Sequence, residues 1–344
     1  MATLRDKTIT MAHGGGGRAM RELIDRLIVP AFDNPHLAAL EDQACVELAS
    51  LAGHGDRIAF TTDSYVVAPL FFAGGDIGKL AICGTVNDLA MAGAVPLYLS
   101  CGLIIEEGFP TADLQRVLGS MAAAAQAAGV QVVTGDTKVV NRGAADKLFI
   151  NTAGIGVVPR GVNISAARAQ PGDVVIVNGT LGDHGVAILV ARNELELQSS
   201  IASDCQPLHG LVRAMLAACP DIHCLRDATR GGLATVLNEF ALSSRVGIRL
   251  QERALPIKAE VRGASEMLGL DVLYMANEGK LVAVVPRSHA EAVLTAMRAH
   301  PAGAEASIVG EVLGEPAGHV VLNTLFGGER VVDMLVGEQL PRIC

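Results

Sequence analysis

The sequence predicts a two-domain α/β protein, and three observations favour this fold class. The chain has 344 residues, more than one domain usually holds. Helical and strand patterns of hydrophobicity are mixed in both halves of the chain. A turn at Pro171 and Gly172 precedes the apolar run "DVVIVNG", where a second α/β half begins. The chain is therefore expected to fold as two mixed units in succession.

The first half begins with a helix and continues with alternating helices and strands. Apolar residues at helical spacing over residues 18–32 predict an amphipathic helix. Residues 57–67 predict a strand pair or a strand entering a loop, and residues 77–105 predict a helix followed by a strand. A further helix has start signals at Thr111 and Asp113 and ends at Gly129. Strands are expected to follow it, up to residues 140 and 158.

The second half repeats this mixture. We expect helices over residues 209–219 and 288–300, a loop entering a helix over 226–242, and strands over 280–286 and up to 324. The last ten residues, "LVGEQLPRIC", have weak periodicity and contain Gly and Pro. Ten extended residues span roughly 33–36 Å, enough to reach from the surface into a cleft or a neighbouring subunit.

Composition excludes several classes of protein. The net charge is −9 and no run of five basic residues occurs, so nucleic acid is not an expected partner. The N-terminus lacks a signal-peptide pattern and no apolar run approaches 18 residues, so we expect a cytoplasmic protein without a membrane partner. The seven cysteines are scattered without a C-x-x-C pair, which argues against a disulfide framework or a zinc ribbon.

Acidic residues recur at strand ends and in loops, next to small residues. They are Asp63, Asp76, Asp88, Asp136 and Asp227. Such a set suits a magnesium–nucleotide site, because Mg²⁺ takes a few carboxylate oxygens together with phosphate and water. Each of them also fits an ordinary turn, where Asp bonds its own backbone. The pattern leaves both interpretations open.

The common phosphate-binding and hydrolase motifs are missing. The stretch "GGDIGKLA" has Leu80 where a P-loop needs Ser or Thr, and neither G-x-G-x-x-G nor G-x-S-x-G occurs. The stretch "TRGGL" enters a helix and is a candidate anion site, although Gly231 and Gly232 equally fit a tight turn.

Lys138 and Glu278 are candidates for proton transfer. Lys138 lies in an otherwise apolar strand and Glu278 directly precedes one. If both were buried they could pair, and burial would move their pKa values toward neutrality. The alternative is two unrelated, solvated residues at strand ends.

The final residue, Cys344, is a thiol at the chain terminus. An exposed thiol there is open to oxidation and exchange. Either the position has no role, or the tail carries a group on its sulfur.

Long blocks along the whole chain carry a family resemblance. They are "AHGGGG", "TTDSYVVAPLFFAGGDIGKLAICGTVNDLAMAGA", "VTGDTKVV", "KLFINTAGIG", "NGTLGDHG", "RDATRGGL", "ANEGKL" and "LPRIC". In these blocks the chain closely resembles the HypE family of hydrogenase maturation proteins, which is similar to the aminoimidazole ribonucleotide synthetase (PurM-like) superfamily. The family commonly has Ser where this chain has Gly15 or Gly16, so no side-chain role is assigned there.

The resemblance implies an α/β (α+β) PurM-like two-domain fold. It implies an N-terminal ATP-binding domain over residues 1–160, which pairs through its sheet in a homodimer. It further implies an α+β C-terminal domain over residues 161–334 and a flexible tail over 335–344 that carries Cys344.

The resemblance also implies an activity, a carbamoyl dehydratase that uses ATP and Mg²⁺. The partner HypF would load a carbamoyl group onto Cys344 as a thiocarbamate, and ATP would drive its dehydration to a thiocyanate. The cyanide would then pass to iron on a HypC–HypD complex, for the [NiFe] hydrogenase centre. A carrier that visits three places belongs on a mobile tail, which gives Cys344 its role.

The same resemblance assigns roles to individual residues. Cys344, Lys138 and Glu278 are the expected catalytic residues, the last two for removing protons from the carbamoyl nitrogen. The expected metal ligands are Asp63, Asp88, Asp136 and Asp227. The ATP site is expected to contain these four together with Lys79, Asn87, Thr137, Asn151 and Gly231.

Two alternatives remain beside the dehydratase. One is a related enzyme that phosphorylates a free small amide or amine, which would not need Cys344. The other is a non-catalytic scaffold for hydrogenase assembly factors with a vestigial nucleotide site. The presence of the Asp, Lys and Glu positions argues against the scaffold.

Overall fold

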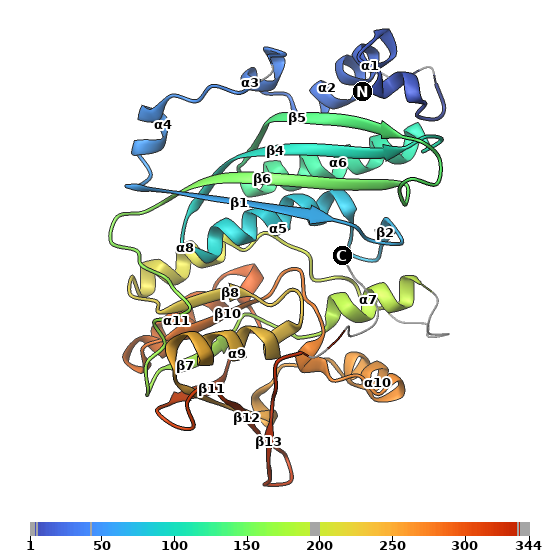
Figure 1. Cartoon of the computed structure of the whole chain (residues 1–344). Helices are drawn as coiled ribbons and strands as arrows, with labels where there is room; N and C mark the ends of the chain where they lie inside the picture. Colours follow the sequence, from blue (N-terminus) through green and yellow to red (C-terminus); the bar gives the residue numbers. More distant parts are fainter. Residues whose placement is uncertain (1–3, 5, 42, 193–199, 336, 338–344) are drawn as a thin grey trace.

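A four-stranded sheet forms the centre of the N-terminal half of the computed structural model, which describes residues 4, 6–41, 43–192, 200–335 and 337 (Figure 1). The strands are β1 (Arg57–Tyr65), β4 (Val95–Glu106), β5 (Gln131–Val140) and β6 (Leu148–Val158), in the order β1-β6-β4-β5. Only β4 and β5 run parallel. The mixture of helices and strands predicted from the sequence is therefore confirmed for this half.

One face of this sheet is covered by α5 (Ile77–Met91) and α6 (Thr111–Ala128), whose apolar residues share a core with the strands. Asp76 caps α5, since its Oδ1 accepts hydrogen bonds from the backbone N–H groups of Gly78 and Lys79. For Asp76 the structural interpretation therefore holds: its carboxylate bonds nearby backbone and caps a helix. Gly129 ends α6 in the left-handed conformation, as its position in the sequence predicts.

The opposite face of the sheet is open in a single chain. Side chains alternate along a strand, so every second residue of β1 points away from α5. Two of these are large and apolar: Ile58 is 60% exposed and Phe60 is 70% exposed. Phe60 lies opposite Ile155 of β6, which lies opposite Tyr98 of β4. An apolar strip therefore crosses the sheet on its uncovered side.

The N-terminal segment packs beside β5. Residues 18–32 form one continuous helical run, made of α1 (Arg18–Leu23), a π-helical turn (Ile24–Ile28) and α2 (Val29–Phe32). This confirms the predicted amphipathic helix, whose Leu23 and Leu27 are buried against the first core. Two short helices follow, α3 (Pro35–Ala38) and α4 (Leu48–Ala52), and a small hairpin of β2 (Phe71–Phe72) and β3 (Gly75–Asp76) precedes α5.

The C-terminal half contains a seven-stranded sheet in the order β13-β12-β9-β11-β7-β10-β8. Its strands are β7 (Val174–Val177), β8 (Cys224–Asp227), β9 (Gly247–Gln251), β10 (Leu281–Val285), β11 (Ser307–Leu313), β12 (Val320–Asn323) and β13 (Glu329–Val331). Helices cover both faces of its centre. That explains why β7 and β10 are apolar throughout instead of alternating.

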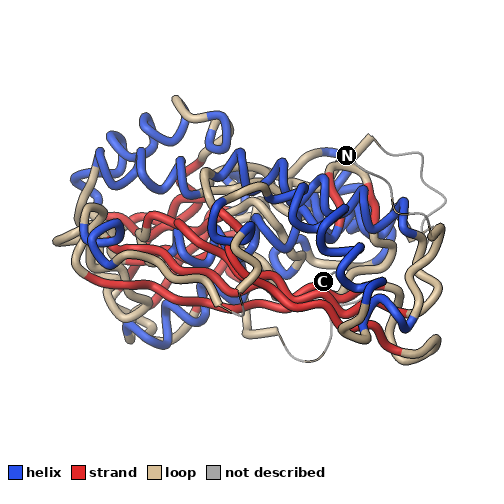
Figure 2. Tube along the Cα trace, turned by 90° about the horizontal axis from the view of Figure 1, so that it is seen from above, coloured by secondary structure: helices blue, strands red, loops and turns tan. Residues whose placement is uncertain are grey.

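The two helical layers can be assigned from the cores. On one face α7 (Asp183–Ala191), α9 (Gly232–Ser244) and α10 (Ala259–Leu268) pack on Val175 and Val177. On the other, α8 (His209–Ala218) and α11 (Ala290–Arg298) pack on Val174 and Ile176. Figure 2 shows the long strands running along the length of the molecule with helices beside them.

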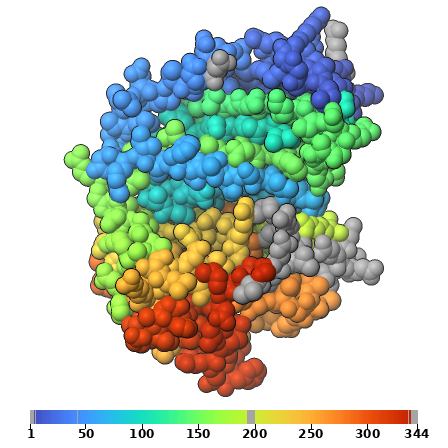
Figure 3. Space-filling model, viewed as in Figure 1, coloured from blue at the N-terminus to red at the C-terminus, as the bar shows by residue number. Residues whose placement is uncertain are grey.

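Helix α5 joins the two halves, which are stacked one above the other in Figure 3. Its Ala90 and Met91 belong to the same apolar cluster as Leu211 and Met215 of α8. The opposite side of α5 packs on the N-terminal sheet. Among the described residues, no helix has both the length and the apolar character needed to cross a membrane.

Candidate active site

Three of the predicted carboxylates converge where the two halves meet. Asp63 lies near the end of β1, Asp88 in α5, and Asp227 at the end of β8. Thr61 Oγ1 donates a hydrogen bond to Asp88 Oδ2 (2.9 Å), and an Arg230 guanidinium nitrogen lies 3.5 Å from Asp63 Oδ1. The end of β1, a buried helix and the end of β8 therefore bring these groups together from both domains.

The carboxyl groups of this cluster raise one another's pKa values in spite of the nearby Arg226 and Arg230. Burial raises the pKa of Asp88, and the nearby carboxylate of Asp63 raises it further, against the lowering effect of Thr61. Burial, followed by the charge of Asp88, raises the pKa of Asp227 to about 7. The cluster is arranged so that a cation or a cation-bound ligand would relieve the repulsion.

This shift predicts a pH dependence of stability. The pKa of Asp227 rises from 3.8 to about 7 on folding, so between these values the folded chain binds more protons than the unfolded chain. The stability that the protonated Asp227 carboxyl contributes to the fold is complete below pH 3.8 and is lost as the pH rises to about 7. Asp227→Asn, which cannot ionise, is expected to raise the free energy of unfolding at about pH 8, without nucleotide or metal. The full shift corresponds to about 4 kcal/mol, and partial contact with solvent reduces the expected gain to about 2 kcal/mol.

Urea unfolding at about pH 5 and pH 8 measures this effect. Asp221 is the matched control, because the hydrogen bond from Arg168 lowers the pKa of its exposed carboxyl and Asp221→Asn should not stabilise. Equal stability of Asp227→Asn and the unchanged chain at pH 8 would contradict the prediction.

Glu278 is buried in the loop of the C-terminal half that precedes β10, where this loop meets α5. Its backbone N–H donates to Asp204 Oδ1 (3.1 Å), and Asn87 Nδ2 of α5 lies 3.4 Å from its backbone oxygen. Burial raises the pKa of its carboxyl well above the usual range, and the carboxylates of Asp204 and Asp227 act in the same direction. A buried carboxyl with a raised pKa is a candidate for proton transfer.

Lys138 and Asp136 lie on β5, at the opposite edge of the sheet from β1. Lys138 is exposed, whereas Glu278 is buried, and no ion pair joins them among the described residues. Asp136 Oδ1 accepts a hydrogen bond from the backbone N–H of Thr137 (2.8 Å). Within one chain these residues are thus separate from the cluster of Asp63, Asp88 and Asp227.

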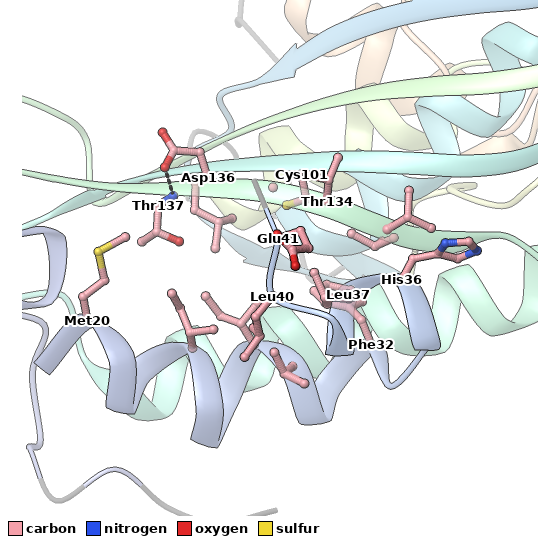
Figure 4. A pocket seen from close by; sticks show the side chains of 17 residues that line it. Met20, Phe32, His36, Leu37, Leu40, Glu41, Cys101, Thr134, Asp136 and Thr137 are labelled. Atoms are coloured by element: carbon pink, nitrogen blue, oxygen red, sulfur yellow. Dashed lines mark hydrogen bonds between the residues drawn. The ribbon is translucent and has the colours of Figure 1, made fainter. Parts of the chain in front are cut away.

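A cavity of about 170 Å³ borders Asp136 and Thr137. Figure 4 shows it between β5 and the N-terminal segment, with Met20, Leu37 and Leu40 on the far side. Its walls are mainly apolar, with a polar end at Asp136 and Thr137. Such a lining accepts a mainly apolar group that has a polar end.

The remaining predicted residues have identified contacts. Lys79 Nζ donates to the backbone oxygen of Gly74 (2.9 Å), and Asn151 Nδ2 donates to that of Asp63 (2.9 Å). The amide of Asn87 bonds the backbone at Gln206, Leu208 and Glu278, so it joins α5 to two loops of the other domain. Gly231 precedes α9 with φ +72°, and a Cβ there would lie 2.0 Å from Thr235 Oγ1. Cys344 lies outside the described residues.

Several other polar residues beside Glu278 carry no signal in the sequence. Lys280 Nζ lies 3.0 Å from Asp204 Oδ2, and both side chains are buried. His184 of α7 and Ser203 lie within the same interior. Asp204 and Ser203 stand in a loop without periodicity, and His184 stands in an apolar helix, so no local pattern marks them.

The donor set fits a magnesium–nucleotide complex better than a bare metal ion. Among the described residues, no three His, Cys, Asp or Glu side chains are close enough together to hold an ion. Mg²⁺ usually takes only one or two carboxylates and completes its coordination with phosphate and water. Asp63, Asp88 and Asp227 supply that kind of oxygen, and the raised pKa values of Asp88 and Asp227 fit a partner of positive charge.

Comparison with known proteins places this architecture. Residues 40–158 match the N-terminal domain, and residues 170–323 the C-terminal domain, of AIR synthase related protein. The fold is therefore that of the AIR synthase related, PurM-like class. The "Carbamoyl dehydratase HypE" of Rhodobacter capsulatus is 57% identical over 341 residues, which cover 99% of both chains. The chain belongs to the HypE carbamoyl dehydratase family.

Two solved structures are similar in three dimensions. HypE in complex with ATP has a TM-score of 0.93 and 48% identity, covering 98% of this chain and 100% of that one. HypE in a HypE–HypF complex has a TM-score of 0.78 and 49% identity, covering 92% and 99%. The predicted family and fold class are thereby confirmed. The domain limits at residues 160 and 334 and the roles of individual residues stay predictions.

Proposed function

We propose that this chain dehydrates a carbamoyl group held as a thiocarbamate on Cys344, converting it to a thiocyanate at the expense of ATP. The observation that carries the proposal is the full-length likeness to a carbamoyl dehydratase. The cyanide so formed would serve the iron of [NiFe] hydrogenase during maturation. The buried Glu278 beside a carboxylate cluster is consistent with this chemistry.

The reaction needs a phosphoryl acceptor and a base. The carbamoyl oxygen takes the γ-phosphoryl group and later leaves as part of phosphate, while the nitrogen loses both of its protons and forms the triple bond to carbon. We assign the proton removal to Glu278 and Lys138. Glu278 is buried and the pKa of its carboxyl is raised, which is the direction that a base at physiological pH requires.

ATP binding is supported by the similar protein solved with ATP. We propose that Asp63, Asp88 and Asp227 face its phosphates through Mg²⁺, with Asp136 as the fourth ligand. Bound Mg²⁺ would neutralise phosphate charge during transfer. We keep Lys79, Asn87, Thr137, Asn151 and Gly231 as proposed members of the nucleotide site. For Asn87 the geometry favours an indirect role, since its amide is bonded to the backbone of two loops.

We also propose a homodimer that pairs through the open face of the N-terminal sheet. Ile58 and Phe60 would bury large apolar surface there, which a lone chain leaves in water. Asp136 and Lys138 are exposed residues of the same sheet. Lys138 lies opposite Ile104 of β4, which is 42% exposed on the open face, and Asp136 shares this face by alternation. Pairing would therefore place both residues at the interface with the second copy.

Phe60→Glu is expected to convert the dimer to monomers. A charge on the apolar strip would have to be buried on pairing, at a cost of several kcal/mol for each copy. Sedimentation equilibrium measures the molar mass. Phe326, which is 99% exposed in the loop between β12 and β13, is the matched control. A dimer that survives Phe60→Glu would refute pairing through this face.

The proposed partners follow the family. The solved HypE–HypF complex supports a HypF-type carbamoyltransferase as the source of the carbamoyl group. A HypC–HypD iron complex is proposed as the acceptor of cyanide, in the cytoplasm.

The experiment that tests the proposal uses the full chain, a HypF-type carbamoyltransferase, carbamoyl phosphate and ATP. The intact mass and the mass of the C-terminal peptide are followed with and without Mg²⁺. We expect a carbamoyl adduct on Cys344 that loses the mass of one water when Mg²⁺ and ATP are both present. An adduct that persists unchanged would favour the scaffold. No adduct, with the transferase active on a control protein, would favour an enzyme that acts on a free amide.

A further inference from the structure

His184 is held rigidly beside Glu278. It lies in the first turn of α7 and is completely buried. Its Nδ1 lies 2.8 Å from Ser203 Oγ, and its ring meets the ring of Phe72 edge to face at 5.6 Å. Two contacts from different elements thus fix the orientation of the imidazole.

The fixed ring presents its second nitrogen to the Glu278 carboxyl. His184 Nε2 lies 4.0 Å from Glu278 Oε1, and both side chains are buried. That distance is longer than a hydrogen bond. Catalytic hydrogen bonds are often long without substrate and shorten in the complex, so a small movement of Glu278 would close it.

The hydrogen bonds around Ser203 permit an arrangement in which the proton of the imidazole is on Nε2. Ser203 Oγ accepts a hydrogen bond from the backbone N–H of Cys205 (3.2 Å), and its own hydroxyl proton can then go to His184 Nδ1. Nδ1 is the acceptor in this arrangement, which leaves the proton on Nε2. A neutral imidazole in this tautomer donates toward the Glu278 carboxylate.

We propose that His184, oriented by Ser203, is a positioning residue for Glu278: its Nε2–H holds the carboxylate in the orientation from which it takes a proton. This inference rests on the proposed role of Glu278 as the base. The interaction favours the ionised carboxylate in a place where burial and the neighbouring Asp204 oppose it. His184 itself need not touch the substrate.

The test measures the rate of dehydration on the carbamoylated full chain in a single turnover, at saturating ATP, together with the dissociation constant for ATP. His184→Phe should slow dehydration about 10- to 100-fold, the range seen when a group that orients a functional residue is lost. The dissociation constant for ATP should change less than about 3-fold. The base acts in the transition state of dehydration and takes no part in the binding of ATP. Ser203→Ala should slow the reaction about 5-fold. Adding it to His184→Phe should have little further effect, since both act through one ring.

Two further variants separate positioning from folding. His184→Gln keeps an N–H donor near the place of Nε2 and should restore part of the rate lost in His184→Phe. His223→Gln is the matched control, because His223 is also buried and bonded to a carboxylate, that of Asp173. His223 lies at one end of β8, and Asp227 of the carboxylate cluster lies at the other. This control should leave the rate within about 2-fold.

The outcomes distinguish this inference from the proposed function. If the unchanged chain does not dehydrate its carbamoyl group, the proposed function fails. If it does, and both His184→Phe and Ser203→Ala keep its rate, only the role of His184 is overturned. A parallel loss of rate and of ATP affinity in both would also overturn it, because that is the signature of a structural role.

Discussion

Cys344→Ser is expected to abolish carbamoylation of the chain, a larger effect than any other substitution should have on this step. A thiolate is a far better nucleophile at neutral pH than a serine hydroxyl, and only the sulfur can become the thiocyanate carrier. Incubation with a HypF-type transferase, carbamoyl phosphate and ATP should leave the mass of the variant unchanged. The fold should be unaffected, because the side chains of serine and cysteine have nearly the same size and shape.

The chain contains a suitable control for this experiment. Cys45 is the exposed cysteine among those that the structure describes, whereas Cys83, Cys101, Cys205, Cys219 and Cys224 are buried. Cys45→Ser should accept the carbamoyl group at the same rate as the unchanged chain. An adduct that forms on Cys344→Ser, or that disappears in Cys45→Ser, would show that Cys344 is not the carrier.

Glu278→Gln is expected to stop the reaction one step later. The glutamine has nearly the same shape and can keep the backbone contacts to Asp204 and Asn87, but it cannot accept a proton. Loss of a general base typically slows a reaction by about 10²- to 10⁴-fold. Carbamoylated protein should therefore accumulate in the presence of Mg²⁺ and ATP.

Three measurements on Glu278→Gln give independent information. The mass of the C-terminal peptide over time gives the dehydration rate, and titration with ATP should give an affinity at least as high as before. Thermal unfolding should show no loss of stability, because a buried carboxyl with a raised pKa destabilises the chain at neutral pH. Glu291, an exposed residue of α11, is the control for a Glu→Gln change. Dehydration at the normal rate in Glu278→Gln would exclude this residue as the base.

Local signals in the sequence predicted much of the fold. The helical run over residues 18–32, the end of α6 at Gly129 and the turn at Pro171 before β7 all follow from spacing and turn chemistry within a few residues. The parts that were not predicted depend on contacts between distant segments. Helix α7 and its His184, for example, come from an apolar stretch that could have been a strand or a helix.

The candidate site shows the same division. The acidic residues with small neighbours included Asp63, Asp88 and Asp227, and the structure brings these three together from two strands and a helix of both halves. Asp76, from the same pattern, is a helix cap, because the pattern alone does not separate a cap from a ligand. The sequence also could not decide whether Lys138 pairs with Glu278. Which face of a sheet a lysine occupies depends on register, and in one chain Lys138 is exposed and Glu278 is buried.

Helix α5 has a consequence for any attempt to divide the protein. One side of it completes the core beneath the N-terminal sheet, and Ala90 and Met91 on the other side complete the core around α8. A fragment that ends near residue 160 would expose that second side to water, and its complement would lose the apolar cover of Leu211 and Met215. The two domains have separate sheets, but each needs the other to keep its apolar surface out of water. Fragments, domain swaps and circular permutations should therefore preserve the contact between α5 and α8.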